Sequence, residues 1–362
     1  MSATLTSPGP ALPPESPRVR AVTDFAEISR LVQDAGLMRR RYAYYWAKLV
    51  GMVVVWAALI TAFVLVGDSW WQLVTAVVAA IVMTQTAFLG HDAAHRQMFV
   101  SGRWNEWTSL VVANLFVGLS YGWWQHKHTK HHGNPNKEGV DPDIDLPVLA
   151  FTASQAASRR TPITRWFAAH QGWFFFPLLL LEGVDLHYQG LKRVFGREPI
   201  ARRGVEILFL GTRLVGYVVL VFTVLSPAKA VVFVALHLAL FGLYMGGSFA
   251  PNHKGMPIVP KDLKVDFLRR QVLMSRNVTG GRFVDVALGG LNYQIEHHLF
   301  PSMPRVSLRH AQPIIAAFCA AKGVKYTQTS LFASYGIVIR YLNEVGLGAR
   351  DNFTCPLVQS SR

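Results

Sequence analysis

The chain has 362 residues, of which 51% are hydrophobic, and its formal net charge at pH 7 is +15. Its long apolar stretches argue against a pair of soluble domains and indicate one membrane-embedded domain. The positive charge does not indicate nucleic-acid binding, because no such module is recognisable and membrane topology accounts for where the basic residues fall.

Four stretches are long enough to cross a hydrocarbon core of about 30 Å, which takes about 20 helical residues. They are Leu49–Val66, Trp70–Gly90, Val205–Leu225 and Lys229–Ala250. All Lys and Arg residues except Arg213 and Lys229 lie before the first span, between the second and third, or after the fourth. With the spans paired as two tight hairpins, this is the positive-inside pattern, which places both termini in the cytoplasm.

The other segments complete the predicted fold. The Pro-rich start predicts a disordered tail over residues 1–40, followed by a membrane domain over 41–345 and a C-terminal tail over 346–362. Leu110–Trp124 and Trp173–Leu181 are too short, or too broken by Gly and Pro, to span, so we expect interfacial or re-entrant segments there. The predicted fold class is all-α and integral to the membrane, with four transmembrane helices in two hairpins and a cytoplasmic helical cap.

Seven of the 13 histidines fall into three tight clusters, each downstream of an apolar segment. The clusters are His91 and His95, then His128, His131 and His132, then His297 and His298. Spacings of three or four residues put imidazoles on one face of a helix, within reach of a shared metal ion. His253, just after the fourth span, makes an eighth candidate. Because both hairpins return to the cytoplasm, all these histidines reach one membrane face.

Eight imidazoles are twice the number that a tetrahedral zinc site needs, so the cap is predicted to hold two metal ions. Neutral imidazole suits Fe, Cu, Ni and Zn, so the ligand type alone does not identify the metal. Further candidates for the metal or its surroundings are Gln294, Asn252, His126, Asp92, Asp141 and His187. Asp92 and Asp141 could orient ligating imidazoles. The alternatives are a solvated Pro turn for Asp141 and an exposed position for His126.

The pattern HxxxH, HxxHH and QxxHH, in this order after paired spans, resembles that of the membrane fatty-acid desaturases over roughly residues 40–325. The Gln-led third box is similar to that of the front-end and actinobacterial acyl desaturases. The resemblance implies a di-iron centre that uses O2 and two electrons to remove two hydrogens from an acyl chain. It also implies that the iron ligands are His91, His95, His128, His131, His132, His253, His297 and His298.

Two departures from the family pattern affect what the resemblance implies. Related acyl-CoA desaturases place an Asn four residues before the lone histidine, where this chain has Phe249, so Asn252 or Gln294 could take that role. Many front-end members carry a cytochrome b5 domain with a His-Pro-Gly-Gly signature, which is absent from this sequence. We therefore expect the electrons to come from a separate protein, either a ferredoxin or a flavin/iron–sulfur reductase. This donor would dock on the basic cytoplasmic surface. We expect the protein to lie in a bacterial cell membrane.

Several alternatives stay open at this stage. A fatty acyl or lipid hydroxylase could use the same di-iron scaffold, and the acyl carrier could be CoA or a lipid. A metal transporter is disfavoured, because the clusters lie at the cytoplasmic ends of the spans and not at their centres. The aromatic residues Tyr121, Trp123, Trp124 and 173–176 could line an acyl tunnel or form an interfacial belt.

Two polar residues lie inside predicted spans, away from the clusters. His237 is sixteen residues from His253, roughly 24 Å along a helix, so it cannot share the same metal and we expect an interhelical hydrogen bond instead. Arg213 lies in the third span, and no partner for it is evident from the sequence. An ionisable group within a membrane is a candidate functional residue.

Overall fold

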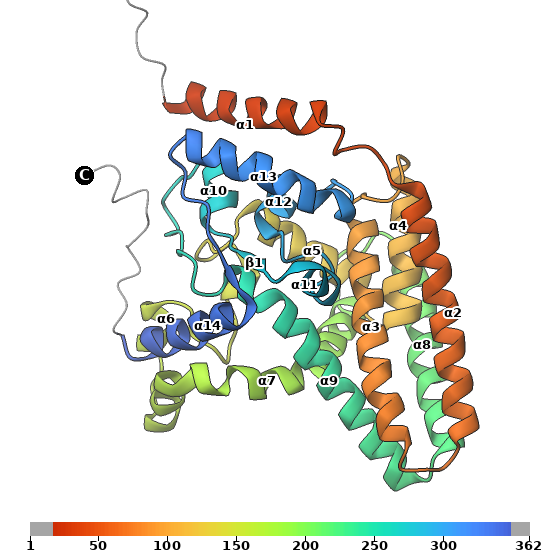
Figure 1. The fold of residues 1–362 in the computed structure, drawn as a ribbon. Coiled ribbons are helices and arrows are strands. Elements are labelled where there is room, and N and C mark those ends of the chain that lie inside the picture. The colour runs from red at the N-terminus through yellow and green to blue at the C-terminus, as the bar shows by residue number, and fades with distance from the viewer. Residues whose placement is uncertain (1–16, 349–362) are drawn as a thin grey trace, which may run out of the picture.

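The computed structural model describes residues 17–348, so residues 1–16 of the predicted N-terminal tail and 349–362 of the predicted C-terminal tail lie outside this range. Within this range, all the regular elements except two short strands are helical (Figure 1). In order, the elements are α1 (Pro17–Asp34), α2 (Tyr42–Val66), α3 (Gln72–Ala94), α4 (Gly102–Leu110), η1 (Val111–Val117), α5 (Tyr121–Gly133), η2 (Pro142–Ile144), α6 (Ala153–Ala157), α7 (Pro162–Phe195), α8 (Arg203–Val224), α9 (Pro227–His253), α10 (Phe267–Leu273), β1 (Asn277–Thr279), α11 (Gly281–Ala287), α12 (Gln294–Leu299), α13 (Arg305–Ala321), β2 (Gln328–Ser330) and α14 (Leu331–Gly346).

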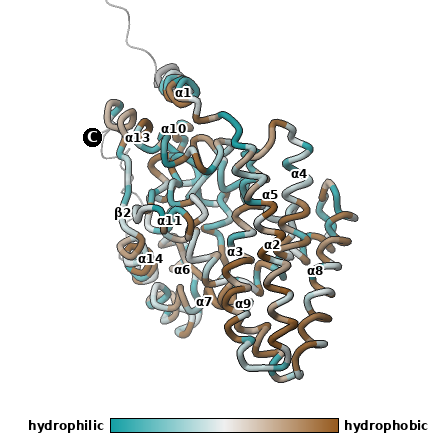
Figure 2. Tube along the Cα trace, turned by 45° about the vertical axis from the view of Figure 1, so that its right-hand side comes forward, coloured by the Kyte–Doolittle hydropathy of each residue, from teal (hydrophilic) through white to brown (hydrophobic). Residues whose placement is uncertain are grey.

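The four predicted spans are confirmed as α2, α3, α8 and α9, each long and apolar enough to cross a membrane. Their turns lie together at one end of the molecule, where the amide of Ser226 and the ammonium of Lys229 contact the Asp68 carboxylate at 2.9 and 3.1 Å. Figure 2 shows hydrophobic residues concentrated along these helices. Both hairpins therefore return to the same side, where α3 and α9 run on past their predicted ends to Ala94 and His253.

The segment Leu110–Trp124 turns back within the structure, as a re-entrant segment does. α4 continues into the π-helical turn η1, which packs against α3 and α8. Gly118 ends this turn with a φ of 89°, a conformation that glycine adopts without steric cost. The chain then reverses into α5, which carries the second histidine cluster.

The segment Trp173–Leu181 is the middle of α7, which has 34 residues and packs against α9 and α14. We expected this segment not to span the membrane, and α7 is not among the helices that are apolar enough to do so. Pro177 does not interrupt the helix. Gly183 lies where α7 crosses α9, so close that a Cβ there would collide with the Leu238 carbonyl. Several α7 side chains, including Trp166 and Trp173, are exposed, as expected for a helix at an interface.

The prediction of a disordered tail up to residue 40 was wrong for residues 17–34, which form α1. Figure 1 shows α1 beside α13, and both helices contribute to one core cluster in which Ile28 and Val32 are fully buried. Asp24 accepts ion pairs from Arg269 and Lys322, both at 3.1 Å. These partners are more than 240 residues away in the sequence, so the Pro-rich start of the chain gave no indication of the docked helix.

The cap is formed by α5 and by the elements from α10 to α14. It includes one short parallel pair, with Asn277 opposite Gln328, which is the only sheet within residues 17–348. This pair lies beside α12, which carries the third histidine cluster and contacts α3 and α9 at the ends that are remote from the hairpin turns.

Candidate metal centre

The structure brings all eight predicted histidine ligands together in two adjoining groups. One group contains His91, His95, His128, His132 and His297, and the other contains His131, His253 and His298. Within each group the candidate donor atoms lie within 4.8 Å of one another. The histidines come from the ends of α3 and α9 and from the short helices α5 and α12, so the centre lies where both hairpins meet the cap.

Ring nitrogens face one another across both groups. The Nε2 of His128 lies 2.9 Å from the Nε2 of His95 and 2.9 Å from that of His132. In the second group, the Nε2 atoms of His131 and His253 are 3.3 Å apart. Metal–nitrogen bonds of about 2.1 Å place neighbouring ligand nitrogens roughly 3.0–3.4 Å apart in octahedral or tetrahedral geometry. The observed spacings fit imidazoles that share a cation.

The second group shows most clearly why a cation is required. The Nδ1–H of His131 donates to Asp141, that of His253 donates to the Met274 carbonyl at 3.0 Å, and that of His298 donates to Gln271. A neutral imidazole with a protonated Nδ1 has a lone pair on Nε2. Three lone pairs therefore converge in a buried space, and the Nε2 of His298 has no hydrogen-bond partner among the described residues. This donor set fits a metal ion.

Burial favours the neutral, ligating form of most of these imidazoles. Burial and then the neighbouring imidazoles hold the pKa values of His128, His132, His297 and His298 well below the usual range. Burial lowers the pKa of His95 to about 3. His131 differs, because the nearby carboxylates of Asp141 and Asp143 outweigh the effect of burial and raise its pKa.

Asp141 lies where it was predicted to orient a ligating imidazole. Its Oδ2 and Oδ1 lie 3.0 and 3.1 Å from His131 Nδ1, and the carboxylate also accepts the backbone N–H groups of Asn136 and Asp143 at 2.7 and 2.9 Å. Only 1% of Asp141 is exposed, which rules out the alternative of a solvated turn. These bonds fix both the carboxylate and the imidazole ring.

Asp92 has a different partner from the one that we expected. Its Oδ1 is 3.8 Å from His91 Nδ1, beyond hydrogen-bond distance, while its Oδ2 pairs with Arg305 Nε at 2.8 Å. The ion pair joins α3 to the start of α13. Asp92 therefore links α3 to α13 of the cap and does not orient His91.

Gln294 and Asn252 lie beside the second group. The Gln294 amide nitrogen is 2.9 Å from His253 Nε2, and Asn252 Nδ2 donates to Gln294 Oε1 at 3.3 Å. Asn252 Oδ1 is buried without a partner among the described residues. Both amides can thus reach the space that the second group encloses.

His126 and His187 lie away from the centre. His126 is exposed on the face of α5 opposite the second cluster. His187 donates from Nδ1 to the Gly183 carbonyl at 2.6 Å, and its ring faces Phe241. The structure therefore does not bring His187, a candidate for the surroundings of the metal, to the centre, because this face of α7 is turned toward η1 and the spans.

Gln271 and Arg276 support the centre, but no sequence pattern indicated either. Gln271 Oε1 accepts from His298 at 2.9 Å and its Nε2 donates to the His132 carbonyl at 2.9 Å, so one buried amide links the second and third clusters. Arg276 donates to the Pro251 and Lys254 carbonyls at 2.9 and 3.0 Å. These carbonyls end α9, where a cation is favourable, so Arg276 fixes the helix end that carries His253.

Helix α12 is held from its far side by a second buried group. Glu296 accepts from Asn277 and from the Tyr326 hydroxyl, both at 2.6 Å, and burial raises its pKa to about 7. Asn277 Oδ1 also accepts the Ile295 amide at 2.9 Å. The helix therefore presents His297 and His298 on one face and is anchored through Glu296 on the other.

A narrow apolar slot of about 50 Å³ adjoins the first group. Its lining includes His91, Tyr121 and Trp124, and the Trp124 ring stacks on His128 with a centroid distance of 4.3 Å. Of the aromatic residues considered for a tunnel, these two reach the slot, whereas Trp173 is exposed. A wider groove of about 850 Å³ runs along the opposite face of α5, between Lys130, Arg193 and the apolar side of α7.

Comparisons with known proteins agree with this geometry. The family model described as fatty acid desaturase matches residues 68–330. An acyl-lipid (9-3)-desaturase of Physcomitrium patens is 30% identical over 92% of this chain, which covers 65% of that protein. A Delta(8)-fatty-acid desaturase of Helianthus annuus is 25% identical, with 91% and 74% covered, and the Delta(6)-fatty-acid desaturase fat-3 of Caenorhabditis elegans is 26% identical, with 90% and 75% covered. The chain belongs to the fatty acid desaturase family.

Proposed function

We propose that the protein is an O2-dependent desaturase that introduces a double bond into a fatty acyl chain. The observation that carries this proposal is the pair of buried histidine groups beside an apolar slot. Membership of the family and the names of the relatives, which include Delta(6)-, Delta(8)- and acyl-lipid desaturases, support it.

The eight histidines would hold two iron ions, His91, His95, His128, His132 and His297 forming one set and His131, His253 and His298 the other. Gln294 and Asn252 lie beside the second set and would complete it, directly through an amide oxygen or through water. Iron held by these residues would supply the chemistry for an O2-dependent removal of two hydrogens from the acyl chain.

The chain's own residues position the substrate and exclude water. The slot is lined by apolar side chains such as Leu119 and Phe249, which fit a methylene chain and leave little room for solvent. Trp124 lines the slot and packs on a candidate ligand, His128. Asp141, Gln271 and the Met274 carbonyl each hold the Nδ1 proton of one imidazole, so each Nε2 faces the metal.

The groove outside α5 is suited to the carrier of the acyl chain, CoA or a lipid. Lys130, Lys192 and Arg197 along it offer cations to phosphate groups, while Leu178 and Phe175 supply an apolar wall. Electrons would come from a separate ferredoxin or flavin/iron–sulfur reductase, and the basic face of the cap would favour an acidic partner. The positive-inside pattern supports a cytoplasmic active site in a bacterial cell membrane.

Lipid analysis of an expressing host tests the proposal. We expect the wild type to yield a fatty acid lighter by two hydrogens, and His297→Ala to yield none. His310→Ala is the matched control, because His310 is exposed and lies outside both groups. A product heavier by one oxygen would identify a hydroxylase instead. No new product from iron-loaded protein supplied with a competent reductase would contradict both activities.

A further inference from the structure

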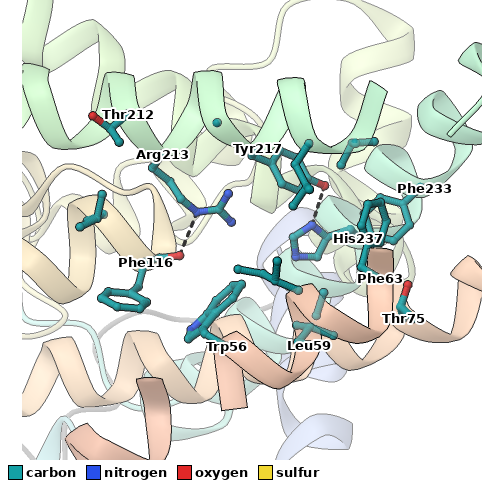
Figure 3. Close-up of a pocket in the computed structure, with 16 residues that line it drawn as sticks. Trp56, Leu59, Phe63, Thr75, Phe116, Thr212, Arg213, Tyr217, Phe233 and His237 are labelled. Carbon is teal, nitrogen blue, oxygen red and sulfur yellow. Dashed lines mark hydrogen bonds between the residues drawn. The ribbon is translucent and has the colours of Figure 1, made fainter. Parts of the chain in front are cut away.

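A third cavity, of about 290 Å³, lies among the membrane spans and is almost entirely apolar. Its walls come from α2, α3, η1, α8 and α9, and Figure 3 shows Trp56, Phe116 and Phe233 around it. Its size is close to that of small-ligand pockets. Arg213, near the centre of α8, extends its guanidinium into this space.

The guanidinium is only partly satisfied by the protein. Its Nε donates to the Phe116 carbonyl at 2.9 Å, and it lies 4.9 and 5.6 Å from the ring centroids of Tyr217 and Trp56. Within residues 17–348, the Phe116 carbonyl is the one acceptor of a hydrogen bond from this guanidinium, and no carboxylate forms an ion pair with it. The nearest carboxylate on α8, Glu206, is bound by Ser120 and Asn114 instead.

We propose that this cavity binds a free fatty acid whose carboxylate pairs with the two Nη groups of Arg213 while its chain fills the apolar walls. A carboxylate can accept two parallel N–H groups of a guanidinium. An unpaired charge in the bilayer is costly, so an anionic ligand stabilises Arg213 there. A fatty acid can enter the hydrocarbon region because its carboxyl group becomes neutral in a low dielectric, whereas a phospholipid phosphate stays at the interface.

The cavity opens toward the bilayer between α2 and α8. Ile60 on α2 and Gly216 on α8 both line it and are exposed. At the other side Tyr217 and His237 close it, joined by a hydrogen bond of 2.8 Å (Figure 3), which confirms the interhelical bond predicted for His237. A single-chain lipid can therefore reach Arg213 from the membrane.

This site is separate from the metal centre. Met83, Val117 and Phe241 form a buried cluster that packs against Met245 of the slot and Trp56 of the cavity, so protein fills the space between them. His237 is also sixteen residues along α9 from His253. The inference thus concerns a second lipid site, and its test needs no catalysis.

Quenching of tryptophan fluorescence by a brominated palmitic acid tests the proposal, with the full chain in lipid nanodiscs. The contribution of Trp56 is the difference between the wild type and Trp56→Phe. We expect saturable quenching of Trp56 and at least tenfold weaker binding after Arg213→Met. The matched brominated alcohol should bind the wild type at least tenfold more weakly than the acid.

Two glycines of α8 give a matched pair of variants that leave Arg213 in place. A side chain at Gly216 enters the cavity, and a Cβ built at Gly216 or Gly211 meets nothing within 4 Å, so both positions tolerate substitution. Gly216→Leu should abolish Trp56 quenching, whereas Gly211→Leu, outside the cavity, should not change it. Equal binding by the wild type, Arg213→Met and Gly216→Leu would overturn the proposal, as would displacement of the acid by equimolar phosphatidylglycerol.

Discussion

The metal centre and the membrane cavity both place nitrogen atoms in apolar surroundings, but the two sites favour ligands of opposite charge. At the centre, imidazole lone pairs converge at 2.9–3.3 Å, so the space calls for a cation. In the cavity, the Nη groups of the Arg213 guanidinium donate no hydrogen bond to the described residues, so an anion would be favourable there. The centre is also braced by a surrounding set of hydrogen bonds from Asp141, Gln271 and Met274. Convergent acceptors and unpaired donors therefore distinguish a metal site from a lipid site within one fold.

Removal of a ligating imidazole should have the largest effect. We expect His128→Ala and His298→Ala each to lower product formation by more than about 100-fold, beyond the 10- to 100-fold loss typical when a group supporting a metal ligand is removed. Gas chromatography of lipids from the expressing host measures this loss. If either variant formed product within tenfold of the wild type, the histidine group that contains the substituted residue would not be needed for activity.

Asp141→Asn should weaken metal binding by about 10- to 100-fold, because His131 loses the charged acceptor of its Nδ1 proton. The neighbouring Asp145→Asn is the control, since Asp145 is exposed and lies outside the groups that could hold a metal. Titration of the metal-free protein with Fe(II) gives both affinities. Equal affinities for the two variants would show that Asp141 is not needed to orient His131.

Gln271→Leu should weaken iron binding by about tenfold, because the variant removes the acceptor for His298 and the bond to the His132 carbonyl. Gln271→Glu retains an acceptor oxygen for His298, so it should recover most of the lost affinity. The same Fe(II) titration distinguishes the two variants. A positioning role for Gln271 would be excluded by equal loss in both.

Arg276→Met should act on stability more than on iron binding. The variant leaves the Pro251 and Lys254 carbonyls at the buried end of α9 without a donor, at a cost of at least about 2 kcal/mol. Thermal unfolding in detergent should show a lower Tm than for Arg282→Met, whose side chain is exposed. An unchanged Tm would mean that water or another side chain satisfies these carbonyls.

The sequence predicted the parts of the fold that depend on local composition. Hydropathy located the four spans, and the spacing of the histidines located seven of the eight members of the two groups, because both patterns repeat within a few residues. The eighth, His253, was located by its position just after the fourth span. It did not predict the docking of α1, the continuity of α7 through Pro177, or the Asp92–Arg305 pair. Gln271 and Arg276 were missed for the same reason, since their partners lie on other elements and only the assembled cap brings them together.

The metal content of the purified protein tests the central claim most directly. We expect about two irons per chain in the wild type, and about one in His91→Ala and in His253→Ala, which each remove a ligand from only one group. Elemental analysis of matched preparations gives these numbers, with His126→Ala as the control. A wild type that binds a single metal ion, or none, after loading with iron would contradict the two-metal centre.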